Sequence, residues 1–412
     1  MATDPFYETI KPTVYLARAY ALVPFSLESG TLQLLNLTIT TVVTSYYVYG
    51  ITEVYSSMYH NPILPKFEKM MLILQVTATS SVAISSWLVN HLWYKDIVST
   101  LKKLLNVESL LVSQDLHVDV KYRRKLQLQF IVTIAFFSLQ NVMDNFILGE
   151  NIIALFIIYT IAMLTLSHFL LLICLCRRYY SFINDKIKTL GELSPEGLAD
   201  IFKLSEEMNS WGRKTIPFQN RNSFKHSLKT VMECHSELFI VCGSINKYFG
   251  LQILLNVTAN MLNVTSICYY VPAIVIDESD KPHHYMIISI KSVSFIALFA
   301  FSQLWIMAHI CSSTCDEANS TGILVHGISN QPKFSCFSIE LDAFYTQLLH
   351  QRINFSAHGF FAIDFTLINT VIGVVITYIV ILIQFQMSNE TPKSTNSTAV
   401  NMLMENTTTN ML

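Results

Sequence analysis

Seven long stretches that are nearly free of charged residues constrain the fold of this chain most. Each is about as long as one membrane-spanning helix, which needs roughly 20 mainly apolar residues. Only 14% of the 412 residues are charged, whereas a soluble domain carries about 25%. We therefore expect an all-α membrane protein with seven transmembrane helices. The predicted spans are Gln33–Tyr55, Met70–Trp93, Leu126–Phe146, Ile152–Cys176, Tyr248–Ile276, Ser292–Cys311 and Phe365–Met387.

The distribution of Lys and Arg predicts the orientation of these spans. Seven basic residues lie between the second and third spans, and eleven lie between the fourth and fifth. Basic residues accumulate in cytoplasmic loops, so both connections are predicted to be cytoplasmic. The N terminus is then cytoplasmic and the C terminus extracellular. Both long connections are amphipathic, and we expect them to extend the membrane helices into the cytoplasm.

The same pattern divides the chain into five predicted parts. The tail carries three Asn-x-Ser/Thr acceptor sequences, at Asn389, Asn396 and Asn406, which are glycosylated only if the tail reaches the lumen. The parts are a cytoplasmic segment (1–32), a six-helix sensing bundle (33–311) with cytoplasmic helical loops (94–125 and 177–247), a cytoplasmic linker and anchor helix (312–362), a seventh helix (363–388) and an extracellular disordered tail (389–412).

One face of the last span is polar. Its members are three or four residues apart, so they share one narrow side of a helix, while the other faces carry Val, Ile and Leu. Two explanations remain open at this point, a contact between helices or the wall of a water-filled pore. The polar stripe consists of Thr370, Gly373, Thr377, Ile381, Gln384 and Ser388.

The same region carries a family resemblance. Thr377-Tyr378, five apolar residues and Gln384-Phe385 resemble the TYhhhhhQF signature of insect gustatory receptors, and the preceding run from Phe355 to Leu367 resembles that family's lead-in. The resemblance implies a ligand-gated, non-selective cation channel with the final helices of four subunits around a pore. It implies that Gln384 forms a ring of amides and that Ile381 forms an apolar ring that closes the pore, with Phe385 as the second candidate for the gate.

A ligand site is predicted nearer the outer face. Ionisable groups inside a membrane cost about 2.5–3.5 kcal/mol each at mid-depth, so Asp144 and Lys291 are candidates, although Lys291 could instead reach the interface. An aromatic cavity with a few polar groups suits small polar or amphipathic ligands. The candidate lining is Asn141, Asp144, Asn145, Tyr159, Tyr269, Tyr270 and Lys291. We expect His168, deeper in the fourth span, to make a helix–helix hydrogen bond.

No catalytic motif is present in the sequence, so we expect a receptor that needs no cofactor or metal. A G-protein-coupled receptor would need the opposite orientation and a D-R-Y after the third span, where Gly149-Glu150-Asn151 stands instead. An odorant receptor of the same superfamily remains an alternative. The expected partners are a small-molecule tastant, permeant cations, membrane lipid and further subunits of the same or a related kind, in the plasma membrane of sensory neurons. Nucleic acid is not expected. A bitter plant compound is expected rather than a sugar, because that branch of the family is larger.

Overall fold

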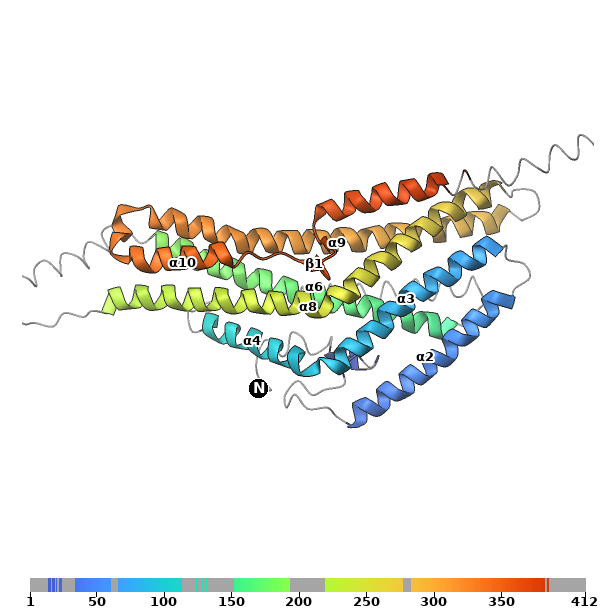
Figure 1. Cartoon of the computed structure of the whole chain (residues 1–412), viewed down its shortest axis with the longest axis horizontal. Coiled ribbons are helices and arrows are strands. Elements are labelled where there is room, and N and C mark those ends of the chain that lie inside the picture. The colour runs from blue at the N-terminus through green and yellow to red at the C-terminus, as the bar shows by residue number, and fades with distance from the viewer. Residues whose placement is uncertain are drawn as a thin grey trace, which may run out of the picture. The chain divides into compact units, whose positions relative to one another are not determined.

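The computed structural model describes residues 14–15, 17–18, 20, 22–23, 34–60, 66–112, 124, 128, 131, 152–192, 219–276, 283–381 and 384. These residues are helical almost throughout, as the sequence predicts (Figure 1). The helices are α2 (Leu34–His60), α3 (Lys66–Leu92), α4 (Tyr94–Val112), α6 (Ile152–Gly191), α8 (Gln219–Ile276), α9 (His283–Ser329), the 3-10 helix η1 (Pro332–Phe337), α10 (Ser338–His350) and a last helix, Phe365–Ile381.

Several of these helices can cross a membrane by length and composition. Among the described residues, four long apolar segments meet this condition, and the last helix is a shorter apolar one. The all-α membrane fold is thereby confirmed, while the number of spans and the orientation of the termini stay predictions. The third predicted span lies almost entirely outside the described residues. The four segments are Lys69–Leu92, Tyr159–Gly191, Phe224–Thr265 and Leu298–Ser329.

Three helices are much longer than a bilayer requires. α6, α8 and α9 contain 40, 58 and 47 residues, which at 1.5 Å per residue gives lengths of about 60, 87 and 70 Å. The apolar core of a membrane is about 30 Å thick. Each of these helices therefore continues well beyond the membrane, as the long amphipathic connections predict.

The described chain divides into two compact units. Unit 1 comprises Met1–Asn256 and Ile306–Phe365, and unit 2 comprises Val257–Trp305 and Thr366–Leu412. In unit 1, α2 and α3 pack against each other and against α6. The Trp87 ring of α3 meets the Tyr47 ring of α2 edge-on at 5.1 Å, and its Nε1 donates to the Tyr20 carbonyl at 3.1 Å. This indole therefore ties the N-terminal segment to the membrane helices.

A buried amide joins α6 to α9 in unit 1. The Asn184 side chain is 1% exposed, and its Nδ2 donates to the carbonyl and Oε1 of Glu317, both at 2.8 Å. The Thr321 hydroxyl donates to Asn184 Oδ1 at 2.6 Å. Both polar ends of the amide are satisfied, so the pair of helices is held in one register.

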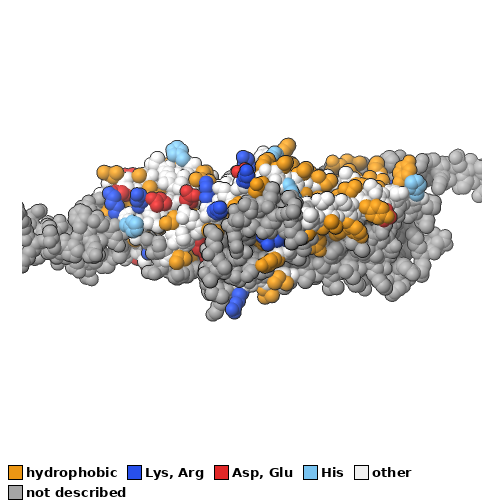
Figure 2. Space-filling model, turned by 90° about the horizontal axis from the view of Figure 1, so that it is seen from below, with side chains coloured by type: hydrophobic (Ala, Val, Ile, Leu, Met, Phe, Trp, Pro, Cys, Tyr) orange, Lys and Arg blue, Asp and Glu red, His pale blue; other side chains and the backbone are white. Residues whose placement is uncertain are grey.

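The anchor helix α10 lies along α8 and α9 (Figure 1). Gln347 Nε2 donates to the Met232 carbonyl of α8 at 3.2 Å, and the His326 ring of α9 lies 5.2 Å from the Tyr345 ring of α10. Charged side chains gather over this part of unit 1, where α8 begins and α9 ends (Figure 2). Such a surface is suited to water rather than to lipid, and the cytoplasmic position of the anchor helix stays a prediction.

A short hairpin connects α10 to the last helix. Its strands β1 (Ser356–Ala357) and β2 (Phe361–Ala362) are antiparallel, with Ser356 opposite Ala362. His358 and Gly359 have φ values of 51° and 81°, the positive φ values that tight hairpin turns require at their central positions. The Ser356 backbone N–H donates to Asn246 Oδ1 of α8 at 3.0 Å. The hairpin is thus bonded to α8 before the chain enters the last helix.

Unit 2 contains the remaining parts of α8 and α9 and the last helix from Thr366 onwards. Asn260 Nδ2 of α8 donates to Gln303 Oε1 of α9 at 3.1 Å. Amide pairs of this kind hold neighbouring helices together where little water is present. Exposed apolar side chains, among them Leu298 and Trp305, lie on the same part of α9, as expected for a helix surrounded by lipid.

Candidate functional site

The last helix has two opposite faces in the structure. One face is buried and consists of Leu367, Ile368, Val371 and Val375. The opposite face is exposed and carries five of the six predicted stripe residues, namely Thr370, Gly373, Thr377, Ile381 and Gln384. The stripe is therefore exposed in the described structure, where it is open to lipid, water or another copy of the chain.

The hydrogen bonds and the surface shape of the stripe follow from its residue types. The hydroxyls of Thr370 and Thr377 donate to the carbonyls of Thr366 and Gly373 one turn earlier, at 2.9 and 2.8 Å. Their protons are thus used within the helix, and their oxygens remain acceptors on the surface. Because Gly373 has no side chain, the surface is hollowed there, in an open depression of about 410 Å³ that Thr370, Thr377 and Tyr378 also line.

Many of the other predicted site residues cannot be compared with the structure. Asn141, Asp144, Asn145, Phe385, Ser388 and the three tail sequons lie outside the described residues. Tyr269 and Tyr270 lie in α8 and Lys291 lies in α9, but the structure does not describe their side chains. Tyr159 is half-buried near the start of α6. The outward ligand pocket accordingly stays a prediction.

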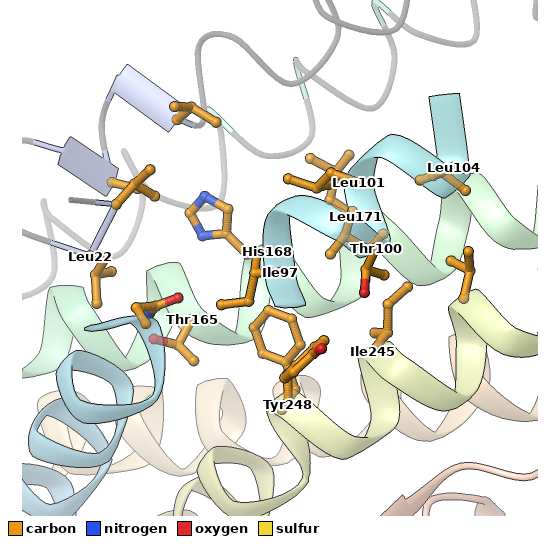
Figure 3. A pocket seen from close by; sticks show the side chains of 17 residues that line it. Leu22, Ile97, Thr100, Leu101, Leu104, Thr165, His168, Leu171, Ile245 and Tyr248 are labelled. Atoms are coloured by element: carbon orange, nitrogen blue, oxygen red, sulfur yellow. The ribbon is translucent and has the colours of Figure 1, made fainter. Parts of the chain in front are cut away.

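A cavity that the sequence did not predict lies in unit 1. It has a volume of about 100 Å³ and lies where α3 gives way to α4, against α6, α8 and the N-terminal segment. His168 lines it and projects from α6 among Leu22, Ile97 and Leu101 (Figure 3). His168 Nδ1 donates to the Leu164 carbonyl of its own helix at 2.6 Å, so this hydrogen bond lies within α6 and does not join two helices.

Metal chemistry has no visible basis in this part of the chain. Among the described residues, no group of three or more His, Cys, Asp or Glu side chains is arranged to hold a metal ion. Cys311 and Cys315, whose spacing resembles half of a metal site, are free thiols in α9.

The fold defines a multi-pass helical membrane protein. The chain belongs to the 7tm chemosensory receptor family, whose model matches residues 10–389. It is 31% identical over 160 residues to putative gustatory receptor 28b of Drosophila melanogaster, and 27% identical over 175 residues to putative gustatory receptor 2a of the same species. The predicted resemblance to insect gustatory receptors is thereby confirmed, within the chemosensory receptor family.

These sequence matches are partial. The first covers 37% of this chain and 33% of receptor 28b, and the second covers 38% of this chain and 40% of receptor 2a. The chain thus covers only about a third to two fifths of the length of these relatives.

The fold is also similar to that of solved structures. The insect olfactory receptor OR5 from Machilis hrabei matches with a TM-score of 0.65 and 10% identity, over 92% of this chain and 98% of that chain. The same receptor in complex with eugenol matches with a TM-score of 0.56 and 12% identity, over 91% and 97%. At these identities the likeness concerns the fold, which extends over nearly the whole length of both chains.

Proposed function

We propose that this protein is a gustatory receptor that acts as a ligand-gated, non-selective cation channel. Four copies, identical or mixed with related receptors, surround a pore that their last helices line. The single observation that carries this proposal is the exposed stripe of the last helix, which lies opposite that helix's buried face. A polar face that its own protomer leaves uncovered is costly against lipid, and neighbouring copies around a water column would cover it.

The side chains of the stripe are suited to line a pore, each at a different position along the helix. Ile381 is 51% exposed, and a ring of four such side chains excludes water when narrow and admits it when widened. Gln384, one turn further on, presents amide oxygens that replace part of a cation's hydration shell. Phe385 and Ser388 complete the proposed pore lining.

A small molecule opens the channel by binding its open arrangement more tightly than its closed one. Shifting the closed-to-open ratio from 1:99 to 99:1 requires about 5.5 kcal/mol of differential binding, summed over the sites. The proposed site is the outward cavity with Tyr159, Tyr269, Tyr270 and Lys291. The olfactory receptor of similar fold was solved with eugenol, which supports a small molecule as the ligand here. A bitter plant compound is favoured over a sugar because that branch of the family is larger. The protein then acts in the plasma membrane of sensory neurons.

The proposal is tested by whole-cell currents of three single variants. We expect Ile381→Ala to raise the resting leak at least several-fold, and Gln384→Ala to change the relative permeability of sodium and potassium. Ile372→Ala is the matched control, because Ile372 is also exposed, at 41%, but lies more than 90° around the helix from the stripe. Unchanged leak and unchanged selectivity in both stripe variants, at normal surface expression, would exclude the stripe from the pore.

A further inference from the structure

The cavity in unit 1 has the chemical character of a site for a neutral ligand. Seventeen described side chains line it, and none of them is Asp, Glu, Lys or Arg. Most are aliphatic, and they come from four helices and the N-terminal segment. Its volume of about 100 Å³ is far more than the roughly 10–15 Å³ that one water needs, and it approaches the roughly 150 Å³ of an apolar cavity that takes up benzene.

The few polar groups of the lining limit further the kind of ligand that can bind. Asn90 Nδ2 donates to the Ser86 carbonyl at 2.8 Å, and the Thr100 hydroxyl donates to the Asp96 carbonyl at 2.9 Å. The Thr100 proton is thus used within the protein, whereas Asn90 Nδ2 keeps a second N–H, so the two side chains can offer the cavity acceptor oxygens and one amide donor. A ligand with a single hydroxyl can donate to such an oxygen. A sugar would bury several hydroxyls, each of which costs about 1–3 kcal/mol without a partner.

We propose that this cavity is a second binding site, for a small neutral molecule with one ring-sized apolar body and one hydroxyl. It differs from the predicted outward pocket in its lining and its position. His168 follows Tyr159 of that pocket by about 13 Å along α6, and the cavity lies at the end of α3 that leads into α4. Under the predicted orientation, this is the cytoplasmic end.

The walls of the cavity are in contact with the connection that leads to the last helix. Phe249 of α8 lines the cavity, and its ring centroid lies 5.7 Å from that of Phe169 of α6. The Phe169 ring in turn meets Phe355 edge-on at 6.3 Å, and Phe355 is 1% exposed immediately before the hairpin. An occupant that displaces Phe249 therefore moves a ring that the connection packs against, so we expect it to change the response to the tastant.

Photolabelling of the full-length receptor in detergent tests the site. The probe is 3-azidophenol, whose azide adds little to the size of phenol and keeps it smaller than 2-naphthol, and peptide mass spectrometry locates the labelled residues. We expect labels in α4 between 97 and 104 and in α8 between 241 and 249, reduced at least tenfold by excess phenol. Labels spread over exposed membrane faces, or labels in these stretches that excess phenol leaves unchanged, would overturn the site.

A matched pair of variants in α4 sharpens the test. Leu101 and Leu105 are both half-buried, but only Leu101 lines the cavity. Leu101→Ala enlarges the cavity, so 2-naphthol should compete with the probe several-fold better than it does in the wild type, while Leu105→Ala should leave competition unchanged. An equal effect of both variants would overturn the assignment. A second result would also overturn the assignment: native mass spectrometry could show a co-purified lipid whose removal raises the labelling. A lipid chain would then be the occupant of the cavity.

The expected effect of the cavity's ligand on the tastant response rests on the proposed channel function, whereas the photolabelling of the cavity is independent of that function. In whole-cell currents, phenol should shift the tastant's half-maximal concentration at least threefold in the wild type. Phe169→Leu should remove most of this shift and leave the labelling intact. A shift that Phe169→Leu leaves unchanged, or no shift in a wild type that is labelled, would overturn the coupling. A receptor that is labelled but gives no tastant-evoked current would instead contradict the proposed function.

Discussion

The hairpin approaches the backbone of α8 closely at Gly250. A Cβ added there would lie 3.1 Å from the backbone nitrogen of His358 and 3.2 Å from its Cα. Ordinary contacts of a Cβ begin at about 3.4 Å, so Gly250→Ala requires the turn to move by a few tenths of an ångström. The turn resists such a movement, because the atoms are backbone and His358 already has a φ of 51°, which is costly for a residue with a side chain.

The magnitude follows from comparison with Gly243, two turns earlier in the same helix. A Cβ at Gly243 would have no neighbour within 4 Å, so Gly243→Ala should gain only the helix propensity of alanine, about 1 kcal/mol. Gly250→Ala gains the same propensity but adds overpacking, which costs about 1–3 kcal/mol. The difference between the two variants isolates the contact, and we expect Gly250→Ala to be less stable by about 1–3 kcal/mol.

The two variants should be compared by thermal unfolding of purified receptor in detergent, with the same lipid and protein concentration. Tastant dose–response curves of both variants test the function of the hairpin, and only Gly250→Ala should displace the curve. Equal unfolding temperatures and equal dose–response curves would refute the reasoning, because the hairpin would then not be held tightly against α8.

Three further results are expected. Asn184→Ala should lower stability by about 1–3 kcal/mol, because it leaves its buried partners in α9 unsatisfied. Ser244→Ala, at a half-buried residue whose hydroxyl bonds only within α8, should change thermal unfolding little. Trp87→Phe keeps an aromatic ring but loses the hydrogen bond to the Tyr20 carbonyl, which should lower the free energy of unfolding by about 0.5–1.5 kcal/mol. Limited proteolysis should therefore cut the N-terminal segment faster in this variant. Trp305→Phe, on an exposed side chain, serves as control. The tail sequons should carry glycans that an endoglycosidase removes, and a tail that is never glycosylated in a secretory cell would contradict the extracellular C terminus.

Local periodicity predicted those features that depend on a single helix. The spacing of Thr370, Thr377 and Gln384 predicted a common face, and the structure places them together because a helix of 3.6 residues per turn fixes this relation without help from the rest of the chain. The predicted helices also follow from runs of apolar residues, which need no knowledge of their neighbours.

Features that join distant segments were not predicted. The cavity requires Asn90, Thr165 and Ile245 to meet, and no local pattern encodes their approach. The hairpin at Ser356–Ala362 is visible in the sequence only as part of the family's lead-in, since two-residue strands carry almost no alternation. The bond of Asn184 to Glu317 likewise spans 133 positions in sequence, which lies beyond any periodicity argument.

The exposed stripe on the last helix also has a consequence for the number of copies of this protein that a cell must produce. A lone protomer would present that edge to hydrocarbon, so an orphan copy is the least stable form of the chain in the membrane. In the proposed tetramer, assembly then depends steeply on the surface density of subunits, and one defective copy in each tetramer would silence its intact companions. Inherited lesions in the last helix should therefore act dominantly, whereas lesions that prevent synthesis should be recessive.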